Sequence, residues 1–361
     1  MLKVTEQVKE LESRAVGVLG KIIGEVPAIQ VEAIDVEPPS SRDRGADIVA
    51  HIQIGNEPRL LLCEVKSSGQ PRHVRSGLLD LRNLAARLGR KAVPIFIAPY
   101  LSPEAQAVCR ENNVGFVDLA GNARLVFDSV FIEKLVAYAP PAERRELKSL
   151  FKPKSAQILR LMLREPKQAW RVADLARDAD VSLGHVSNVR AGLLDREWAR
   201  LSEDGLLLSE PGVLLDAWRA AHEPLEAKRV GFYTVLHGKA LEEAARHVLD
   251  PHSRAGRAVF ASFSAAHWLA PYGRTATQYF YADSAGVELL KQQLKLAPSS
   301  KGENVVVMVP KDDGVFRDAI EPAPGVFCTS DVQTYLDLCT AGERGGEAAE
   351  HLRRTRLNWP A

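Results

Sequence analysis

One stretch, from Gly45 to Gln70, constrains the fold of this chain more than any other. It contains two apolar-rich runs, Ile48–Ile54 and Leu60–Val65, on either side of a Gly-Asn-Glu-Pro segment at positions 55–58. Glycine and asparagine between two such runs predict a tight turn. The stretch is therefore expected to form two strands joined as a β-hairpin.

Three charged residues stand at the ends of this hairpin. Asp47 precedes the first strand, and Glu64 and Lys66 stand at the exit of the second. Because successive side chains of a strand point to opposite faces, Glu64 and Lys66 are expected on one face, with Val65 on the other. Two carboxylates and an amine can therefore meet at one edge of a sheet.

This trio has the composition of a hydrolytic metal site. Carboxylate oxygens suit Mg²⁺, which keeps several waters and also binds phosphate oxygens. A lysine beside the ion can orient or deprotonate one of those waters. The pattern predicts metal binding by Asp47 and Glu64, and hydrolysis of a phosphodiester by Asp47, Glu64 and Lys66. The alternative is a simple surface ion pair between Glu64 and Lys66.

The order of the surrounding elements resembles the PD-(D/E)XK nuclease superfamily, whose core is a helix, a three-strand meander, a helix and a further strand. By that resemblance Asp47 and Glu64 bind the metal and Lys66 is the catalytic lysine. Ala46 stands where the family motif has proline. Some relatives add a glutamate from the first helix, for which Glu10 and Glu12 are both candidates. The expected elements outside the hairpin are a helix over Val4–Ile23, a strand over Ile29–Val36, a helix over Arg72–Leu88 and a strand over Val93–Ala98.

Two polar segments near this region have open interpretations. Arg42 and Arg44, in the loop before Asp47, are within reach of a DNA phosphate, or they belong to a solvated loop. The segment that contains Asp118, Asn122 and Arg124 is a polar site or, more simply, a tight turn between two strands. The remaining first-domain strand is expected over residues 127–136.

Composition limits the remaining possibilities. A length of 361 residues predicts two or three domains, and a net charge of +1 provides no global field for nucleic acid. The segment 144–167 is nonetheless basic, with eight Lys/Arg against two Asp/Glu. The four cysteines lack metal-ligand spacing, and no apolar run is long enough to span a bilayer. A cytoplasmic protein with reduced thiols and no membrane contact is expected.

The second region predicts a DNA-binding module. Helices are expected over Lys154–Arg164, Trp170–Ala179 and Ser182–Trp198, followed by a hairpin whose turn is Asp204-Gly205. This order resembles the winged helix-turn-helix of bacterial transcriptional regulators. In that family the third helix enters the major groove of DNA and presents its N-terminal residues to the bases.

The outward residues of the third helix are short, polar and rich in hydrogen-bond donors, as base and phosphate contacts require. Arg171 and the basic run before the first helix are expected to contact the DNA backbone. The alternative is a winged helix that mediates only protein contacts or dimerisation; a homodimer also suits DNA binding, because two copies read a two-fold site. The candidate DNA-binding residues are Arg171, Ser182, Gly184, His185, Ser187, Asn188 and Arg190.

The last region alternates strands and helices and contains no phosphate loop. One strand is expected over Val259–Phe263 and a helix over Ser264–Leu269, and Trp268 with Phe280-Tyr281 is interpreted as core. The winged helix, the S-A-A-H-W-L-A-P-Y segment at 264–272 and the stretch Phe327–Leu352 together resemble AbiEi-type antitoxins of type IV toxin–antitoxin systems. In that family a winged helix binds the operon's own promoter, and a second domain neutralises a nucleotidyltransferase toxin without a stable complex.

The expected architecture is a multidomain α/β (α+β) fold. A restriction-endonuclease-like domain covers residues 1–140, a winged helix-turn-helix 141–222 and an α/β antitoxin-like domain 223–361. Three functions follow: a transcriptional regulator that binds double-stranded DNA and resembles the AbiEi antitoxins, a Mg²⁺-dependent endonuclease, or a protein-interaction module that acts against a toxin.

Overall fold

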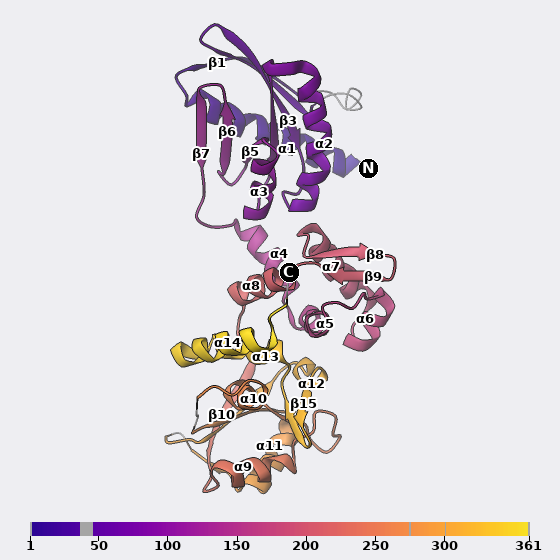
Figure 1. Ribbon diagram of the computed structural model, residues 1–361, viewed down its shortest axis with the longest axis vertical. Coiled ribbons are helices and arrows are strands. Elements are labelled where there is room, and N and C mark those ends of the chain that lie inside the picture. Colours follow the sequence, from indigo (N-terminus) through magenta and orange to yellow (C-terminus); the bar gives the residue numbers. More distant parts are fainter. Residues whose placement is uncertain (1, 37–45, 274–275, 300, 360–361) are drawn as a thin grey trace. The chain divides into compact units, whose positions relative to one another are not determined.

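The chain forms two compact units in a computed structural model that describes residues 2–36, 46–273, 276–299 and 301–359 (Figure 1). The first unit comprises Met1–Glu146 and Leu194–Glu197, and the second comprises Leu147–Leu193 and Trp198–Ala361. Both mix helices and strands, as the sequence predicts. The loop with Arg42 and Arg44 lies outside the described residues.

A seven-stranded sheet organises the described part of the first unit, and its strands follow their sequence order from β1 to β7. Strands β1 to β3 are antiparallel, β3 to β5 are parallel, and β5 to β7 are antiparallel again. The elements are α1 (Leu2–Gly24), β1 (Ile29–Val36), β2 (Ile48–Ile54), β3 (Glu57–Val65), α2 (Pro71–Leu88), β4 (Ala92–Ala98), α3 (Pro103–Glu111), β5 (Gly115–Asp118), β6 (Ala123–Phe127) and β7 (Val130–Lys134), with a 3₁₀ turn at Gly89–Lys91.

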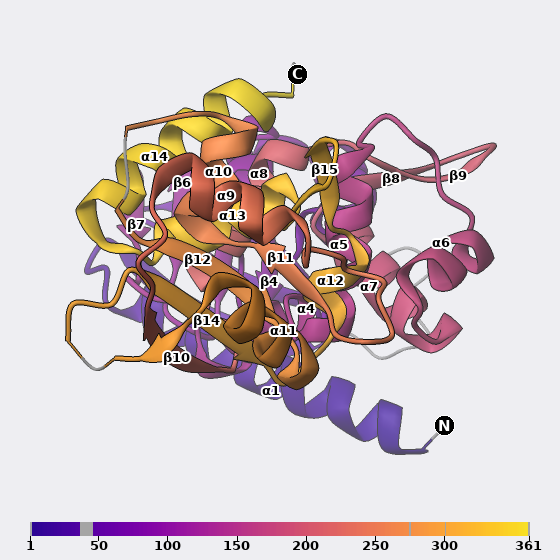
Figure 2. The same cartoon turned by 90° about the horizontal axis from the view of Figure 1, so that it is seen from below.

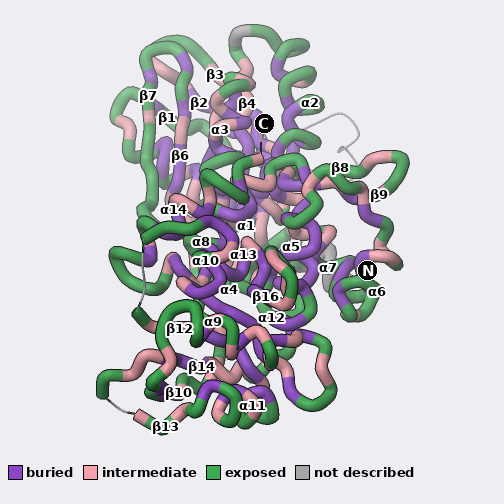
Figure 3. The backbone as a smooth tube through the Cα atoms, turned by 60° about the horizontal axis from the view of Figure 1, so that its bottom comes forward, coloured by how far each residue is buried: buried purple, intermediate pink, exposed green. Residues whose placement is uncertain are grey.

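Helices cover both faces of this sheet because its strands carry apolar side chains on each side. Leu19 and Ile23 of α1 belong to one core with Ile48 and Ile95 of the sheet. On the opposite face, α2 and α3 pack on a second core around Phe96. The buried strands between exposed helix faces are visible in Figure 3. The predicted strand over 127–136 is instead a turn at Asp128 followed by β7, because Asp128 adopts a left-handed conformation with φ 47°.

Three helices and a hairpin open the second unit in the predicted order. They are α5 (Pro153–Arg164), α6 (Val172–Ala179), α7 (Leu183–Asp195), β8 (Ala199–Ser202) and β9 (Gly205–Leu208), and α8 (Pro211–Ala221) follows. Helix α6 begins two residues later than predicted, because Trp170 forms a β-bridge with Leu206. Helix α4 (Pro141–Leu150) precedes them.

A second sheet of seven described strands forms the rest of this unit, and Figure 2 shows β10, β14, β12 and β11 side by side. Its order is β13-β10-β14-β12-β11-β16-β15. The strands are β10 (Ala227–Tyr233), β11 (Ala258–Phe260), β12 (Gln278–Ala282), β13 (Ala297–Pro298), β14 (Val305–Pro310), β15 (Ile320–Ala323) and β16 (Val326–Cys328). The helices are α9 (Gly238–Arg246), α10 (Ser262–Leu269), α11 (Ser284–Leu294), α12 (Gly314–Arg317), α13 (Asp331–Cys339) and α14 (Gly342–Arg356).

The strand predicted over Val259–Phe263 is wrong in its second half. Strand β11 ends at Phe260, and α10 begins at Ser262, which adopts φ 48°. An L-residue in that left-handed region turns the chain sharply, so the apolar run does not continue as a strand.

A buried ion pair joins the predicted winged-helix region to the C-terminal sheet within the second unit. Arg160 of α5 is 3% exposed and donates to Asp318 at 2.7 Å and to the carbonyl of Gly314 at 2.9 Å. At the other end, Arg353 of α14 pairs with Asp216 of α8 at 2.6 Å. The two domains predicted over 141–222 and 223–361 therefore lie, for the most part, in the same compact unit. Across the described residues, every helix is too short or too polar to cross a membrane.

Candidate functional site

The three residues predicted as a metal site come together at the end of the β2–β3 hairpin. Ile48 pairs with Cys63, so Asp47 lies beside the last residues of β3. One carboxylate oxygen of Asp47 accepts a hydrogen bond from the backbone N–H of Val65 at 2.8 Å. Lys66 follows β3 and donates its backbone N–H to Ile97 of the parallel neighbour β4 at 2.9 Å. The hairpin thus brings Asp47, Glu64 and Lys66 to one edge of the sheet.

Glu64 and Lys66 form an ion pair on one face of the strand, as the two-residue period requires. The Glu64 side chain is 16% exposed and that of Lys66 is 39% exposed. Burial raises the pKa of Glu64, the hydrogen bond from Lys66 opposes this rise, and the charge of Asp47 raises the pKa further. The two carboxylates therefore interact electrostatically, although Lys66 engages one of them directly.

Helix α2 passes close over this pair because it carries a glycine there. A Cβ atom added to Gly77 would lie 3.4 Å from Cγ of Glu64, 3.6 Å from Cε of Lys66 and 3.0 Å from the ring of Phe96. Gly77 is a lone glycine in an amphipathic helix, and its sequence context contains no signal of this role. Gln70, before the first turn of α2, is 6% exposed and donates to Glu143 at 2.7 Å.

The carboxylates fit Mg²⁺ only with help from other oxygen donors. Among the described residues, no three His, Cys, Asp or Glu side chains are close enough to hold an ion. Mg²⁺ is commonly bound by one or two carboxylates, with waters and substrate phosphates completing its shell. Asp47 and Glu64 can supply two such ligands once Lys66 releases Glu64. Of the two helix candidates, Glu12 is buried and Glu10 is exposed.

The exposed face of α7 holds the residues predicted to contact DNA. One face of α7 is buried through Val186, Val189 and Leu193. The opposite face of the helix is therefore exposed. The hydroxyl of Ser182 accepts the backbone N–H of His185 at 3.3 Å and caps the helix. The same hydroxyl lies 2.8 Å from Nδ1 of the His185 ring. Ser182, Gly184, His185, Ser187 and Asn188 are exposed, Arg190 is half-buried, and Arg171 is exposed before α6.

The β8–β9 hairpin is anchored to the segment before α6. The backbone groups of Trp170 and Leu206 exchange hydrogen bonds at 2.8 and 2.9 Å. Gly205 has φ 141°, and a Cβ atom there would lie 2.4 Å from the carbonyl oxygen of Trp170. Position 205 therefore requires glycine, because the hairpin approaches the segment before α6 closely there.

Part of the predicted basic segment is used internally. Arg160 is buried in its ion pair with Asp318, and Lys154 lies 3.5 Å from Asp312. Lys148 pairs with Glu223. These three cations are neutralised by the fold, so the segment presents less positive charge than its sequence indicates.

The sequence alone leaves another candidate site undetected, a cavity lined by three aromatic side chains on the second unit, because its residues come from distant segments. A search of protein-family models, curated proteins and solved structures found no match to this chain.

Proposed function

We propose that this chain is a DNA-binding transcriptional regulator that contacts double-stranded DNA through α7. The observation that supports this most directly is the division of α7 between a buried apolar face and an exposed polar face that begins at its N-terminus. In a winged helix-turn-helix, that end of the third helix reaches the base edges in the major groove.

Each polar residue then has a role that suits its chemistry. Asn188 can form two hydrogen bonds with adenine, and Arg190 can do so with guanine. Ser182, His185 and Ser187 can donate to bases or phosphates, and Arg171 can contact the DNA backbone. The β8–β9 hairpin corresponds to the wing.

The most specific form of the proposal is an AbiEi-like antitoxin that acts in the cytoplasm. The winged helix would repress its own operon, a second copy of this chain would be its partner in a homodimer, and the C-terminal region would oppose a nucleotidyltransferase toxin. The motifs at 264–272 and 327–352 support this form.

The test measures DNA binding by fluorescence anisotropy with the full chain and duplexes from the region upstream of its own coding sequence. Asn188→Ala is expected to weaken specific binding by about tenfold or more, because a bidentate base contact contributes roughly 1–3 kcal/mol of discrimination. Arg254→Ala is the control, since Arg254 is an exposed arginine outside these elements. The proposal is overturned if the wild-type chain binds no duplex above its nonspecific level, or if Asn188→Ala binds like the control.

A Mg²⁺-dependent endonuclease is the second candidate, and the convergence of Asp47, Glu64 and Lys66 favours it. A bound Mg²⁺ would polarise the phosphate and acidify a water. Asp47 and Glu64 would hold the ion, and Lys66 would orient or deprotonate the water after leaving Glu64.

The nuclease candidate predicts that the full chain nicks supercoiled DNA in the presence of Mg²⁺ or Mn²⁺. Lys66→Ala is expected to abolish nicking, and Lys91→Ala, at an exposed lysine of the same unit, is expected to preserve it. DNA that stays intact with the wild-type chain but shifts in a gel would exclude the enzyme and leave the regulator.

A further inference from the structure

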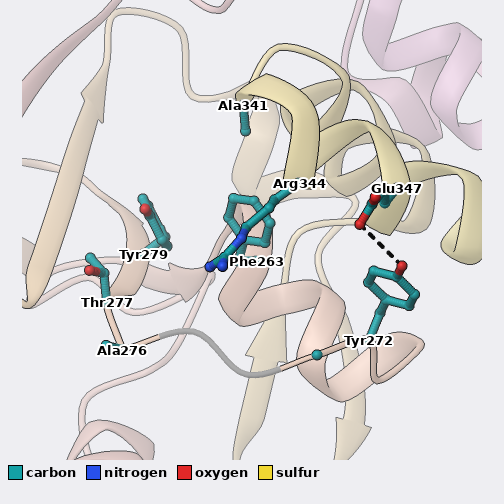
Figure 4. Close-up of a pocket in the computed structure, with 9 residues that line it drawn as sticks. Phe263, Tyr272, Ala276, Thr277, Tyr279, Ala341, Arg344 and Glu347 are labelled. Atoms are coloured by element: carbon teal, nitrogen blue, oxygen red, sulfur yellow. Dashed lines mark hydrogen bonds between the residues drawn. The ribbon is translucent and has the colours of Figure 1, made fainter.

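A cavity of about 720 Å³ lies on the second unit (Figure 4), and none of its lining residues belongs to α7 or to the hairpin β8–β9. Small-molecule sites commonly enclose roughly 300–1,000 Å³. Residues from α10, β12 and α14 line the cavity, together with Tyr272, Gly273, Ala276 and Thr277. The lining side chains that carry chemistry are Phe263, Tyr272, Thr277, Tyr279, Arg344 and Glu347.

Aromatic rings form two sides of this cavity. The rings of Phe263 and Tyr279 lie 5.8 Å apart at 45°, and both side chains are only half-buried, so ring surface faces the space. Tyr272 stands on another side, and its ring packs 5.2 Å from that of His351. Half-exposed rings around a cavity provide surfaces on which a flat ligand can stack.

Buried polar contacts hold the Phe263–Tyr279 wall in place. Ser264, 2% exposed, accepts the backbone N–H of Tyr279 at 2.8 Å and donates to the side chain of Gln278 at 2.7 Å. Ser262, which precedes Phe263, is 6% exposed and has φ 48°. The wall is therefore fixed before any ligand arrives, which lowers the entropic cost of binding.

Helix α14 adds one cation and one anion. Arg344 is exposed and makes no hydrogen bond or ion pair within the described residues, whereas Arg353 and Arg356 of the same helix pair with Asp216 and Asp331. Figure 4 shows Arg344 extending from α14 toward Phe263. Glu347, one turn later, accepts the hydroxyl of Tyr272 at 3.3 Å.

We propose that this cavity binds a nucleotide with one phosphate. The base stacks on Phe263 and Tyr279, and the phosphate accepts hydrogen bonds from the guanidinium of Arg344, whose fork matches phosphate oxygens. Glu347 accepts a hydrogen bond from a sugar hydroxyl or a base N–H. One arginine beside a carboxylate disfavours the higher charge of a triphosphate. The cavity also exceeds what an aromatic amino acid would fill.

The test is isothermal titration calorimetry of the full chain with AMP and GMP. We expect saturable binding by the wild-type chain, and a loss of roughly tenfold or more in Arg344→Gln, because a charge-assisted contact to phosphate disappears. Phe263→Leu is expected to weaken binding through lost stacking. Arg354→Gln, at an exposed arginine on the same helix, is the matched control and is expected to bind like wild type. Adenosine is expected to bind more weakly than AMP, because it lacks the phosphate.

The proposal is overturned if neither nucleotide shows saturable binding, or if Arg344→Gln and wild type bind with equal affinity. Binding of free tryptophan in preference to both nucleotides would also overturn it and would identify an amino-acid site. A (dA)₄ oligonucleotide separates the sources of the ligand. If the oligonucleotide binds more tightly than AMP, and Arg344→Gln removes this difference in affinity, the natural ligand is a nucleotide within single-stranded nucleic acid. Equal melting temperatures for Arg344→Gln and wild type show that the fold is intact.

Discussion

At the scale of single residues, Asp118 shows how a polar motif can be structural. Its carboxylate is fully buried and accepts backbone N–H groups from Leu101, Ala120, Gly121 and Asn122 at 2.9–3.0 Å. The side-chain amide of Asn122 adds a fifth bond at 2.7 Å. Of the two interpretations of this segment, the tight turn accounts for the bonds from Ala120, Gly121 and Asn122, and the bond from Leu101 holds that turn against the segment before α3.

Asp118→Ala is expected to lower the free energy of unfolding of the first unit by on the order of 3 kcal/mol, because several buried donors lose their acceptor together. Chemical denaturation followed by circular dichroism measures this loss. Glu111→Ala removes an exposed carboxylate from the same unit and is expected to change stability by less than about 0.5 kcal/mol. Equal midpoints for the two variants would contradict a structural role for Asp118.

At the scale of elements, local pattern predicts the hairpin and the three helices well. Two apolar runs around a Gly-Asn turn identify β2 and β3, and the Asp204-Gly205 turn identifies β8 and β9. The two-residue period also places Glu64 and Lys66 on one face, which their ion pair confirms. These features depend on neighbours in the sequence, so a single sequence contains them.

Features that depend on distant neighbours escape this kind of prediction. Helix α10 begins at Ser262 because this residue adopts a left-handed conformation. The sequence pattern does not show this, because the apolar residues on both sides of Ser262 predict one continuous strand. The role of Gly77 appears only when α2 lies on Glu64. The aromatic cavity joins Phe263, Tyr279 and Arg344 from three separate elements, and isolated aromatic residues resemble ordinary core.

At the scale of the whole molecule, the second unit depends on charges buried between its parts. Arg160 and Asp318 are 3% and 5% exposed, and they connect α5 with the residue that follows α12. A buried pair costs desolvation energy when it forms, and breaking it leaves one charge without compensation. The pair therefore couples the stability of the helices α5 to α7 to the stability of the C-terminal sheet.

Arg160→Met is expected to destabilise the second unit by roughly 3–5 kcal/mol, because Asp318 stays buried without its cation. The double variant Arg160→Met/Asp318→Leu is expected to recover part of this loss, and a double-mutant cycle from urea unfolding measures the coupling. Lys154→Met is the control, because Lys154 and Asp312 are 45% and 32% exposed and such pairs contribute about 0–1 kcal/mol. An Arg160→Met chain as stable as this control would exclude the linkage.

The order of strands in the two sheets has a consequence for how the chain reaches its native state. Each strand of the first sheet pairs with the strand next to it in the sequence, so no pairing closes a loop longer than the connection that contains α2. In the second sheet, β10 pairs with β14, more than seventy residues later. During synthesis, which proceeds from the N-terminus, the first sheet can assemble strand by strand as it leaves the ribosome. In the second sheet, β11 and β12 can pair with each other early, but β10 must wait for β13 and β14, so β10 is the strand most exposed to misassembly.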